Sequence, residues 1–316
     1  MAVGAKIAVI GVGKMGEYHV GVLSEMREAD LVGIVDVNED RVRSLGEKYE
    51  VSWFTDPKEL YGKVDLVVIA VPTDLHYPIA SEFLNAGIHV LLEKPCSNNL
   101  EHARELFQIA ENKNLILQIG HVERFNAAVQ EMHKIVTEPI YIESKRMSPF
   151  PKRIQGDGVV LDIMIHDIDI VLNLVQSPVV KLNVMGVSVF TEKDDVVNAQ
   201  FAFENGCIGS IVASRASQNK IRTLSVTQKD SYVILDYTDQ EIYVHRQASS
   251  DYQLSKGSLR YKQESLIERI FVHKENPLKQ ELKHFIDCVQ NGIQRKVAVD
   301  NELYSLEIAL DILSQL

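Results

Sequence analysis

The chain is poor in cysteine and has no excess of positive charge, and each shortage excludes a class of protein. Its three cysteines, Cys96, Cys207 and Cys288, lie far apart, and none has the CxxC spacing of a metal ligand. A reducing compartment and no metal centre are therefore expected. Acidic residues outnumber basic ones by 44 to 33, for a net charge of −11. Nucleic acid is not expected as a partner, because such binding depends on neutralising phosphates.

Long apolar segments are missing as well. No apolar run approaches the ~18 residues of a membrane-spanning helix. The N-terminus has no basic start before a long apolar stretch, so no signal peptide and no membrane partner are expected. No internal repeat or low-complexity segment interrupts the chain. We expect a soluble, cytoplasmic protein, whose 316 residues suggest two domains.

The first 120 residues alternate between strand-like and helix-like blocks, as in the βαβ units of a parallel sheet. The run VDLVVIAV at 64–71 is almost continuously apolar, as expected for a strand covered on both faces. The pattern predicts an α/β fold with a Rossmann-type, doubly wound parallel sheet in a domain spanning 1–120. Expected strands are 6–10, 31–35, 64–71, 89–92 and 115–119, and expected helices are 14–27, 75–86 and 100–113.

The pattern changes after residue 120. An apolar helix is expected at 158–175, and two helices, 279–290 and 301–316, are expected to close the chain. Between them lie short strand-like runs separated by polar turns, at 179–189, 197–203, 207–214, 223–227, 231–237 and 241–245. These predict a second, α+β domain over 121–316 with a large, mostly antiparallel sheet. The polar stretch 247–263 is expected to be a surface loop.

A glycine motif, GVGKMG, occupies residues 11–16 between the first strand and the first helix. A lone GxGxxG is weak evidence, but this one sits in a βαβ unit with an acidic residue closing the second strand, which together favour a dinucleotide site. The three glycines allow a tight turn, close approach of the phosphates and close helix–strand packing. The expected cofactor-binding residues here are Gly11, Gly13, Lys14, Met15, Gly16 and Asp36.

Asp36 also bears on the choice of dinucleotide. A carboxylate at this position accepts hydrogen bonds from a ribose diol and repels a 2′-phosphate, so NAD is favoured over NADP. The nearby Arg41 and Arg43 keep the NADP alternative open.

Two further segments carry groups suited to acid–base chemistry. Lys94 follows a strand of the predicted parallel sheet, at the edge where ligands of such sheets bind, although a solvated lysine is an equal alternative. On the expected helix LDIMIHDIDIVL, Asp162, His166 and Asp169 share one face at spacings of four and three residues. Charged groups on so apolar a helix must be paired or used, so a structural carboxylate–histidine pair is the alternative to a catalytic one.

These motifs together resemble the Gfo/Idh/MocA oxidoreductases along nearly the whole chain. The matching segments are GVGKMG, the strand ending at Asp36, VPTDLH at 71–76, EKP at 93–95, GHVERFN at 120–126, and the helix with Asp162 and His166. The resemblance implies a catalytic group of Lys94, Asp162 and His166 acting with NAD on a hydroxyl of a sugar-like substrate. Met164 departs from the glycine that many members carry, which bears on packing more than on chemistry.

The resemblance implies further features. Cofactor contacts are implied for Pro72, Thr73, His76 and Glu93. Glu93 has the alternative of pairing with a nearby lysine. The proline of the EKP motif is expected to be cis, and the sheet of the second domain is expected to build a homodimer or homotetramer.

A group of basic residues bears on the substrate. Arg124, Arg146, Lys152 and Arg153 lie near the catalytic helix in the sequence of an otherwise acidic protein. Arginine suits phosphate or carboxylate oxygens, whereas a solvated loop is the alternative. Arg124, Arg146, Arg153 and Asp169 are taken as candidate substrate-binding residues.

Within the family, these segments most resemble members that oxidise the 3-hydroxyl of UDP-N-acetylglucosamine before an aminotransferase acts in lipid A synthesis. An inositol or free-sugar dehydrogenase is the first alternative. A member that cleaves glycosides through a redox cycle of bound NAD is another. A non-catalytic NAD or sugar sensor is the alternative from a different class, and the presence of all three catalytic residues weighs against it.

Overall fold

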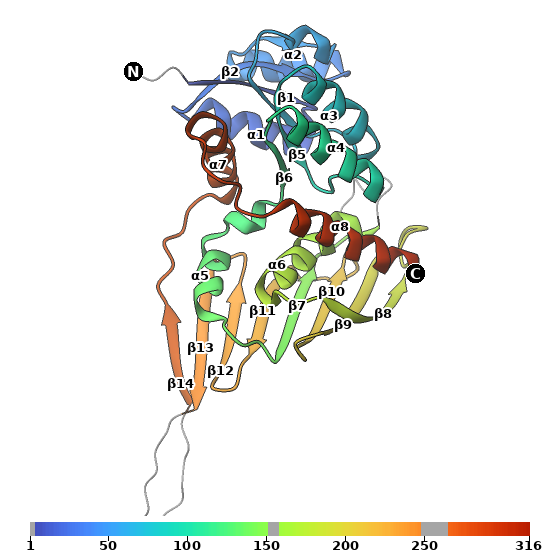
Figure 1. Ribbon diagram of the computed structural model, residues 1–316, viewed down its shortest axis with the longest axis vertical. Coiled ribbons are helices and arrows are strands. Elements are labelled where there is room, and N and C mark those ends of the chain that lie inside the picture. The colour runs from blue at the N-terminus through green and yellow to red at the C-terminus, as the bar shows by residue number, and fades with distance from the viewer. Residues whose placement is uncertain (1–3, 151–157, 248–264) are drawn as a thin grey trace, which may run out of the picture. The chain divides into compact units, whose positions relative to one another are not determined.

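The computed structural model describes residues 4–150, 158–247 and 265–316, which form two compact units (Figure 1). Unit 1 comprises residues 1–125 and 275–311, and unit 2 comprises residues 126–274 and 312–316. The sequence assigned 275–311 to the second domain, whereas in the structure this segment is part of unit 1. The expected loop 247–263 lies outside the described residues except for its first residue.

Unit 1 is built on a six-stranded sheet in the order β3-β2-β1-β4-β5-β6, in which all pairings are parallel, as predicted. Its strands are β1 (Ala5–Ile10), β2 (Ala29–Val35), β3 (Trp53–Phe54), β4 (Leu66–Ile69), β5 (His89–Glu93) and β6 (Leu117–Gly120). Its longer helices are α1 (Lys14–Ser24), α2 (Glu39–Tyr49), α3 (His76–Asn85), α4 (Leu100–Asn112), α7 (Pro277–Asn291) and α8 (Val299–Ser314), the last of which ends in unit 2. Short 3-10 turns are η1 (Pro57–Leu60), η2 (Thr73–Leu75) and η3 (Val122–Phe125).

Both faces of this sheet are covered, because successive residues of a strand point to opposite faces. On β1, Ile7 and Val9 belong to one core cluster, which includes buried side chains of α1, α2 and α7. Ala8 and Ile10 belong to the other, which includes side chains of α3, α4 and α8. The near-continuous apolar strands of the sequence therefore reflect burial on two sides.

The C-terminal helix α7 belongs to unit 1 because of its apolar stripe. Leu282, Phe285 and Ile286 are fully buried in the cluster that also contains Val20 and Leu23 of α1. Burying an apolar side chain of this size stabilises a fold by about 1.5–3 kcal/mol, an upper estimate for a chain that is partly compact when unfolded. This contact spans more than 250 positions of sequence, and no local pattern predicts it.

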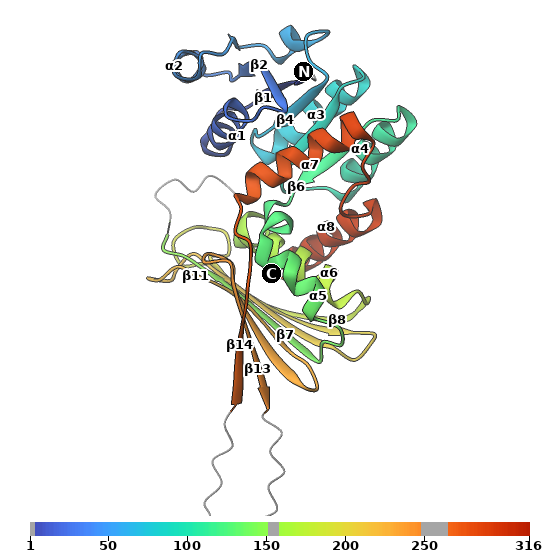
Figure 2. The ribbon, with the colours of Figure 1, turned by 90° about the vertical axis from the view of Figure 1, so that its left-hand side faces the viewer.

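Unit 2 contains an eight-stranded sheet in the order β14-β13-β12-β11-β7-β10-β9-β8. All neighbours are antiparallel except β7 and β10, which confirms the mostly antiparallel prediction. The strands are β7 (Tyr141–Met147), β8 (Val179–Val187), β9 (Val196–Phe203), β10 (Ile208–Ser214), β11 (Ile221–Thr227), β12 (Ser231–Asp236), β13 (Glu241–Gln247) and β14 (Ser265–Ile270). Figure 2 shows helices α5 (Ala127–Ile135) and α6 (Ile165–Val175) on one face of this sheet.

The expected helix 158–175 is not regular throughout. Its first part is a π-helical turn, η4 (Val160–Met164), in which the N–H of Ile165 donates to the carbonyl of Val160. The regular helix α6 follows directly. A π turn widens the helix locally and is frequent at functional sites. Among the described residues, no helix has the length and apolar character needed to cross a membrane.

Candidate functional site

The glycine motif of unit 1 forms a turn that requires glycine at two of its positions. Gly11 has a φ of +84°, and a Cβ there would lie 2.7 Å from the carbonyl oxygen of Ala70. A Cβ on Gly16 would lie 1.8 Å from the carbonyl oxygen of Gly11, so helix α1 could not begin where it does. These two glycines allow the strand, the turn and the helix to pack together.

Gly13 differs from both. It caps α1 in an extended conformation with a φ of −64°, and no heavy atom lies within 4 Å of an added Cβ. No side chain caps the helix, so the N–H groups of its first turn point outward beside exposed Lys14 and Met15. A helix N-terminus with free N–H groups and an open approach fits the diphosphate of a dinucleotide. The open position at Gly13 is the observation that supports this fit.

Asp36, directly after β2, forms a hydrogen bond with the glycine turn. Its Oδ2 accepts a 2.9 Å hydrogen bond from the N–H of Val12, and its Oδ1 accepts one of 2.9 Å from Asn38. The guanidinium of Arg41 lies 3.6 Å from the carboxylate. Asp36 therefore ties the glycine turn to the second strand while keeping a negative charge where the ribose of NAD is expected. Arg41, one of the two arginines that left NADP as an alternative in the sequence analysis, forms an ion pair with Asp36.

The EKP turn after β5 places Lys94 next to a buried contact between a carboxylate and a histidine. The Glu93 carboxylate contacts the ring of His19 on α1 at 2.7 Å, and its other oxygen accepts a hydrogen bond from the N–H of Lys94. Burial pushes the pKa of Glu93 upward, but the hydrogen bond and charge of His19, with the charge of Lys94, outweigh it and lower the pKa. Glu93 thus contacts a histidine that the sequence did not suggest, and the charge of Lys94 also lowers its pKa.

Other predicted cofactor residues lie around the same edge of the sheet. Pro72 is exposed, and Thr73 is half-buried at the start of η2. His76 is buried, with one ring nitrogen 2.8 Å from the carbonyl of Pro95 and the other 3.0 Å from that of Val71. The Lys94–Pro95 peptide is cis, as the resemblance implied. His76 therefore links the turn after β4 to the EKP turn.

Glu281 on α7 is a second carboxyl group in the interior of unit 1. It is fully buried, and neither of its carboxyl oxygens has a hydrogen-bond partner among the described residues. Burial, and then the negative charge of Glu93, raise its pKa well above the usual value. Two neighbouring carboxyls therefore differ in charge: Glu93 is ionised, and Glu281 is a neutral acid.

Replacing Glu281 with glutamine is expected to flatten the pH dependence of unit 1's stability. Because the folded pKa is raised, the folded state binds more protons than the unfolded state above the ordinary glutamate value of 4.5. Wild-type stability should therefore fall with rising pH, by up to about 1.4 kcal/mol per pH unit, until the folded pKa is passed. Glutamine keeps the shape of the neutral acid without titrating.

Trp53, the only tryptophan, lies on β3 and reports unfolding of unit 1 by its fluorescence. Thermal midpoints of wild type and variant would be compared at about pH 5.5, 7 and 8.5, with the variant gaining most at the highest pH. Asp287→Asn on the same helix is the control. If the thermal midpoints of wild type and Glu281→Gln changed with pH in the same way, the raised pKa of Glu281 would be contradicted.

In unit 2, the predicted catalytic helix presents Asp162 from the π turn and His166 from the first turn of α6. Both side chains are partly exposed, whereas Met164 between them is fully buried. The Oδ2 of Asp162 lies 3.9 Å from the guanidinium of Arg215. The two predicted catalytic side chains thus reach the surface of a mostly buried helix, which suits groups that meet a substrate. Lys94, the third, belongs to unit 1.

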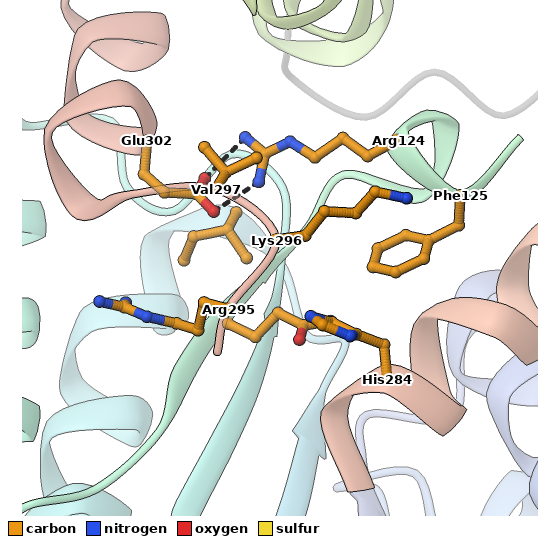
Figure 3. Close-up of a pocket in the computed structure, with 9 residues that line it drawn as sticks. Arg124, Phe125, His284, Arg295, Lys296, Val297 and Glu302 are labelled. Atoms are coloured by element: carbon orange, nitrogen blue, oxygen red, sulfur yellow. Dashed lines mark hydrogen bonds and ion pairs between the residues drawn. The ribbon is translucent and has the colours of Figure 1, made fainter. Parts of the chain in front are cut away.

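The basic residues predicted to bind substrate have other partners. Arg124 is buried and donates to both carboxylate oxygens of Glu302 on α8, at 2.5 and 2.8 Å, as Figure 3 shows. Arg146 on β7 is buried and donates to the carboxylate of Asp167 at 2.6 and 3.2 Å. These bidentate pairs hold elements together inside each unit. Arg153 and Lys152 lie outside the described residues.

Asp169 is also buried, at 1% exposure, and its Oδ1 accepts a hydrogen bond from Asn173 one turn later. Among the described residues, no group of histidine, cysteine or acidic side chains has an arrangement that could hold a metal ion. The described part of unit 2 therefore offers Asp162 and His166, rather than Asp169, for acid–base chemistry.

Several residues of these networks were not predicted from the sequence. His19 lies on the first helix, three positions after Gly16. In the structure it contacts Glu93 at the end of β5. Asp167, which binds Ser144 and Arg146, lies off the helix face that Asp162 and His166 share. Glu281, Glu302 and Arg215 carry no local signal, since each contacts its partners across a long stretch of chain.

Comparison with known proteins agrees with this arrangement. Residues 5–121 match the model of the Gfo/Idh/MocA oxidoreductase family with an NAD-binding Rossmann fold, and residues 118–233 match the family's C-terminal domain. UDP-N-acetylglucosamine 3-dehydrogenase of Acidithiobacillus ferrooxidans is 30% identical over 77% of this chain and 78% of its own length. Its crystal structure superposes with a TM-score of 0.89 at 26% identity, covering 100% of this chain and 98% of the other.

Myo-inositol 2-dehydrogenase of Thermotoga maritima is 30% identical over 66% of this chain and 68% of its own length. A levoglucosan dehydrogenase in complex with NADH shares the fold, with a TM-score of 0.84 at 18% identity, covering 99% of this chain and 97% of the other. The family models together cover more than half of the chain. The chain belongs to the Gfo/Idh/MocA oxidoreductases and is an NAD-dependent enzyme of that family.

Proposed function

We propose that the protein oxidises a secondary hydroxyl of a nucleotide sugar, the 3-hydroxyl of UDP-N-acetylglucosamine, to a ketone with NAD as the acceptor. The similarity to the Acidithiobacillus enzyme, which extends over about three quarters of both chains, carries this proposal. The basic cluster does not support it further, because Arg124 and Arg146 are committed to buried ion pairs. A 3-keto product would suit a following aminotransferase, as in the synthesis of an amino-substituted lipid A precursor.

The proposed chemistry gives a role to each of the three catalytic residues that the family resemblance implies. His166 takes the proton of the substrate hydroxyl as a general base, which suits a partly exposed imidazole. Asp162 orients that imidazole and stabilises its charged form. Lys94 donates a hydrogen bond to the reacting oxygen and stabilises its developing negative charge. NAD supplies the hydride acceptor when it is bound at the glycine turn.

The residues around the EKP turn support Lys94 rather than touch the substrate. The His19–Glu93 pair is buried, and Glu93 accepts a hydrogen bond from the backbone N–H of Lys94. His76 holds the carbonyl of Pro95. The backbone on both sides of Lys94 is thus held by a fixed contact, which sets the point from which its side chain extends. Such fixing of a catalytic group raises the rate by reducing the entropy lost at the transition state.

Single-turnover formation of NADH, with enzyme in excess over NAD, tests the substrate. UDP-N-acetylglucosamine, myo-inositol and glucose would be compared by nicotinamide absorbance. Excess enzyme matters because oxidation of a sugar carbinol is unfavourable and product can remain bound. A signal with the nucleotide sugar alone is expected. A signal only with myo-inositol or glucose would replace the substrate while keeping the dehydrogenase, and silence with all three despite NAD binding would favour the glycoside-cleaving or sensor alternatives.

We also propose that the protein forms a homodimer or homotetramer through the sheet of unit 2. One face of this sheet is covered by α5 and α6 (Figure 2). Exposed apolar side chains remain on its strands, among them Val180, Met185, Val187 and Ile208, at 53–67% exposure. Exposed apolar surface of this kind commonly marks an interface. Light scattering should give a solution mass at least twice the 35.6 kDa of one chain, and a mass of one chain would contradict the proposal.

A further inference from the structure

Arg215 is a fully buried arginine directly after β10 in unit 2. Only 2% of its side chain is exposed, and it is the largest of the fully buried side chains among the described residues. Its Nε donates a 2.8 Å hydrogen bond to Oδ1 of Asp195, and its backbone N–H donates to the carbonyl of the same residue. Burying a guanidinium is costly, so it needs a compensating role.

The Asp195 carboxylate, which binds Arg215, also accepts hydrogen bonds from other donors. Oδ2 of Asp195 accepts hydrogen bonds from the N–H groups of Val189, Phe190 and Thr191, at 2.8, 2.5 and 3.0 Å. The Thr191 hydroxyl donates to Oδ1 as well. Burial raises the pKa of Asp195, but the N–H of Phe190 and the guanidinium of Arg215 outweigh it and keep the carboxylate charged. Asp195 thus has four donors besides Arg215, and the arginine contributes chiefly a positive charge next to this buried carboxylate.

The other end of the guanidinium lies near a second carboxylate, that of Asp162. Its Nη1 lies 3.9 Å from Oδ2 of Asp162, on the π turn that packs against β10. Asp162 is 45% exposed, whereas Asp195 is fully buried. The guanidinium therefore spans from a fixed interior carboxylate to a carboxylate at the surface. An arginine held at one end loses little further entropy in contacting a second group, because its planar fork is already oriented.

We propose that Arg215 is a positioning residue for the reaction: anchored on Asp195, it holds its guanidinium 3.9 Å from the Asp162 carboxylate and so offsets part of the negative charge that Asp162 presents to His166 at the start of α6. This inference rests on the proposed roles of Asp162 and His166. Other charged groups near this end of the helix are Lys193 and Asp194, which lie beside Gly158. Arg215 differs from them because it is buried and does not move freely.

The physical consequence is a balance of charge at His166. The guanidinium offsets part of the negative charge of the nearby carboxylate, and a carboxylate near an imidazole favours the imidazolium. Removing the positive charge of Arg215 leaves Asp162 uncompensated, so the pKa of the His166 imidazole should rise. A higher pKa means that less of the neutral base is present near neutral pH.

The test is an NMR titration of the His166 imidazole in the cofactor-free protein, with the signal assigned by its loss in His166→Asn. Arg215→Gln, which removes the charge but keeps a donor for Asp195, should raise the imidazole pKa by roughly half a unit or more. Arg215→Lys should leave it near the wild-type value. Lys145→Gln is the matched control: it also removes one positive charge, but on β7 the neighbours Ser144 and Arg146 point toward α6, so Lys145 faces the other side of the sheet.

No shift in a folded Arg215→Gln protein, or an equal shift in Arg215→Lys, would overturn the proposal. If Arg215→Gln did not fold, Asp162→Asn would serve in its place. That variant should lower the imidazole pKa, and no change would exclude an effect of Arg215 transmitted through Asp162. The rate of NADH formation from UDP-N-acetylglucosamine should fall at acid pH in all three proteins. The fall should occur at higher pH in Arg215→Gln than in wild type or Arg215→Lys. Full activity in His166→Asn would instead refute the proposed function, and the titration would still report on Arg215.

Discussion

His166→Asn is expected to lower the rate of NADH formation by about 10²–10⁴-fold while the affinity for NAD stays within about a factor of two of wild type. Asparagine keeps a polar side chain on α6 but accepts no proton. The glycine turn and Asp36 belong to unit 1, whereas His166 belongs to unit 2, so the expected cofactor contacts are unchanged. His245→Asn on β13, a half-buried histidine of the same unit, is the matched control and should keep the wild-type rate.

Lys94→Ala should show the same separation, with a loss of about 10²–10³-fold, because a donor to a developing oxyanion contributes on that scale. Lys58→Ala, an exposed lysine of unit 1, is its control. The rate is measured by stopped-flow absorbance and NAD binding by calorimetry. If either catalytic variant turned over at the wild-type rate, the proposed assignment of that residue would be wrong. A loss of NAD binding equal to the loss of rate would indicate misfolding instead.

Gly13→Ala and Gly16→Ala should have opposite consequences although the two glycines are three positions apart. An alanine Cβ at position 13 meets no protein atom within 4 Å, so folding should be unaffected. The same methyl group stands where the NAD diphosphate must approach the helix N-terminus, and affinity for NAD should fall by roughly 100-fold or more. At position 16 the added Cβ would lie 1.8 Å from a backbone oxygen, so the turn must distort. A loss of stability above about 4 kcal/mol is expected there.

Calorimetric titration with NAD and the fluorescence-detected unfolding of Trp53 distinguish the two effects. Gly62→Ala is not a suitable control, because that glycine has a φ of +74° and its replacement would itself cause strain. Ser24→Ala at the end of α1 serves better, since it changes an exposed side chain of the same helix. Normal NAD affinity in Gly13→Ala would show that the diphosphate does not approach this turn.

The sequence pattern did not predict strand β7. Its inward-facing positions include Ser144 and Arg146, so it lacks the apolar alternation by which the neighbouring strands were recognised. In the structure these polar groups are buried against Asp167 of α6, which accepts hydrogen bonds from both. Their desolvation is offset by charge-assisted hydrogen bonds. No strand pattern reveals such a strand, because the partner that makes its burial tolerable lies 21 residues beyond Arg146.

The same limitation changed the interpretation of the basic cluster. Arg124, Arg146 and the acidic residues they bind are distant in the chain: Glu302 is 178 positions from Arg124. In the sequence the arginines looked available for a diphosphate. Their partners become visible only when the chain is folded, because ion pairing depends on distance in space and not on order along the chain.

The sequence by itself determined the parallel sheet, the glycine turn with Asp36, and the candidates Lys94, Asp162 and His166. These depend on residues within one βαβ unit or one helix, where local spacing sets the geometry. Only the tertiary structure decided that α7 and most of α8 complete unit 1, that Glu281 is buried near Glu93, and that Arg215 is buried near Asp162. Such contacts join distant segments, and burial and charge pairing are properties of the packed interior that no local pattern contains.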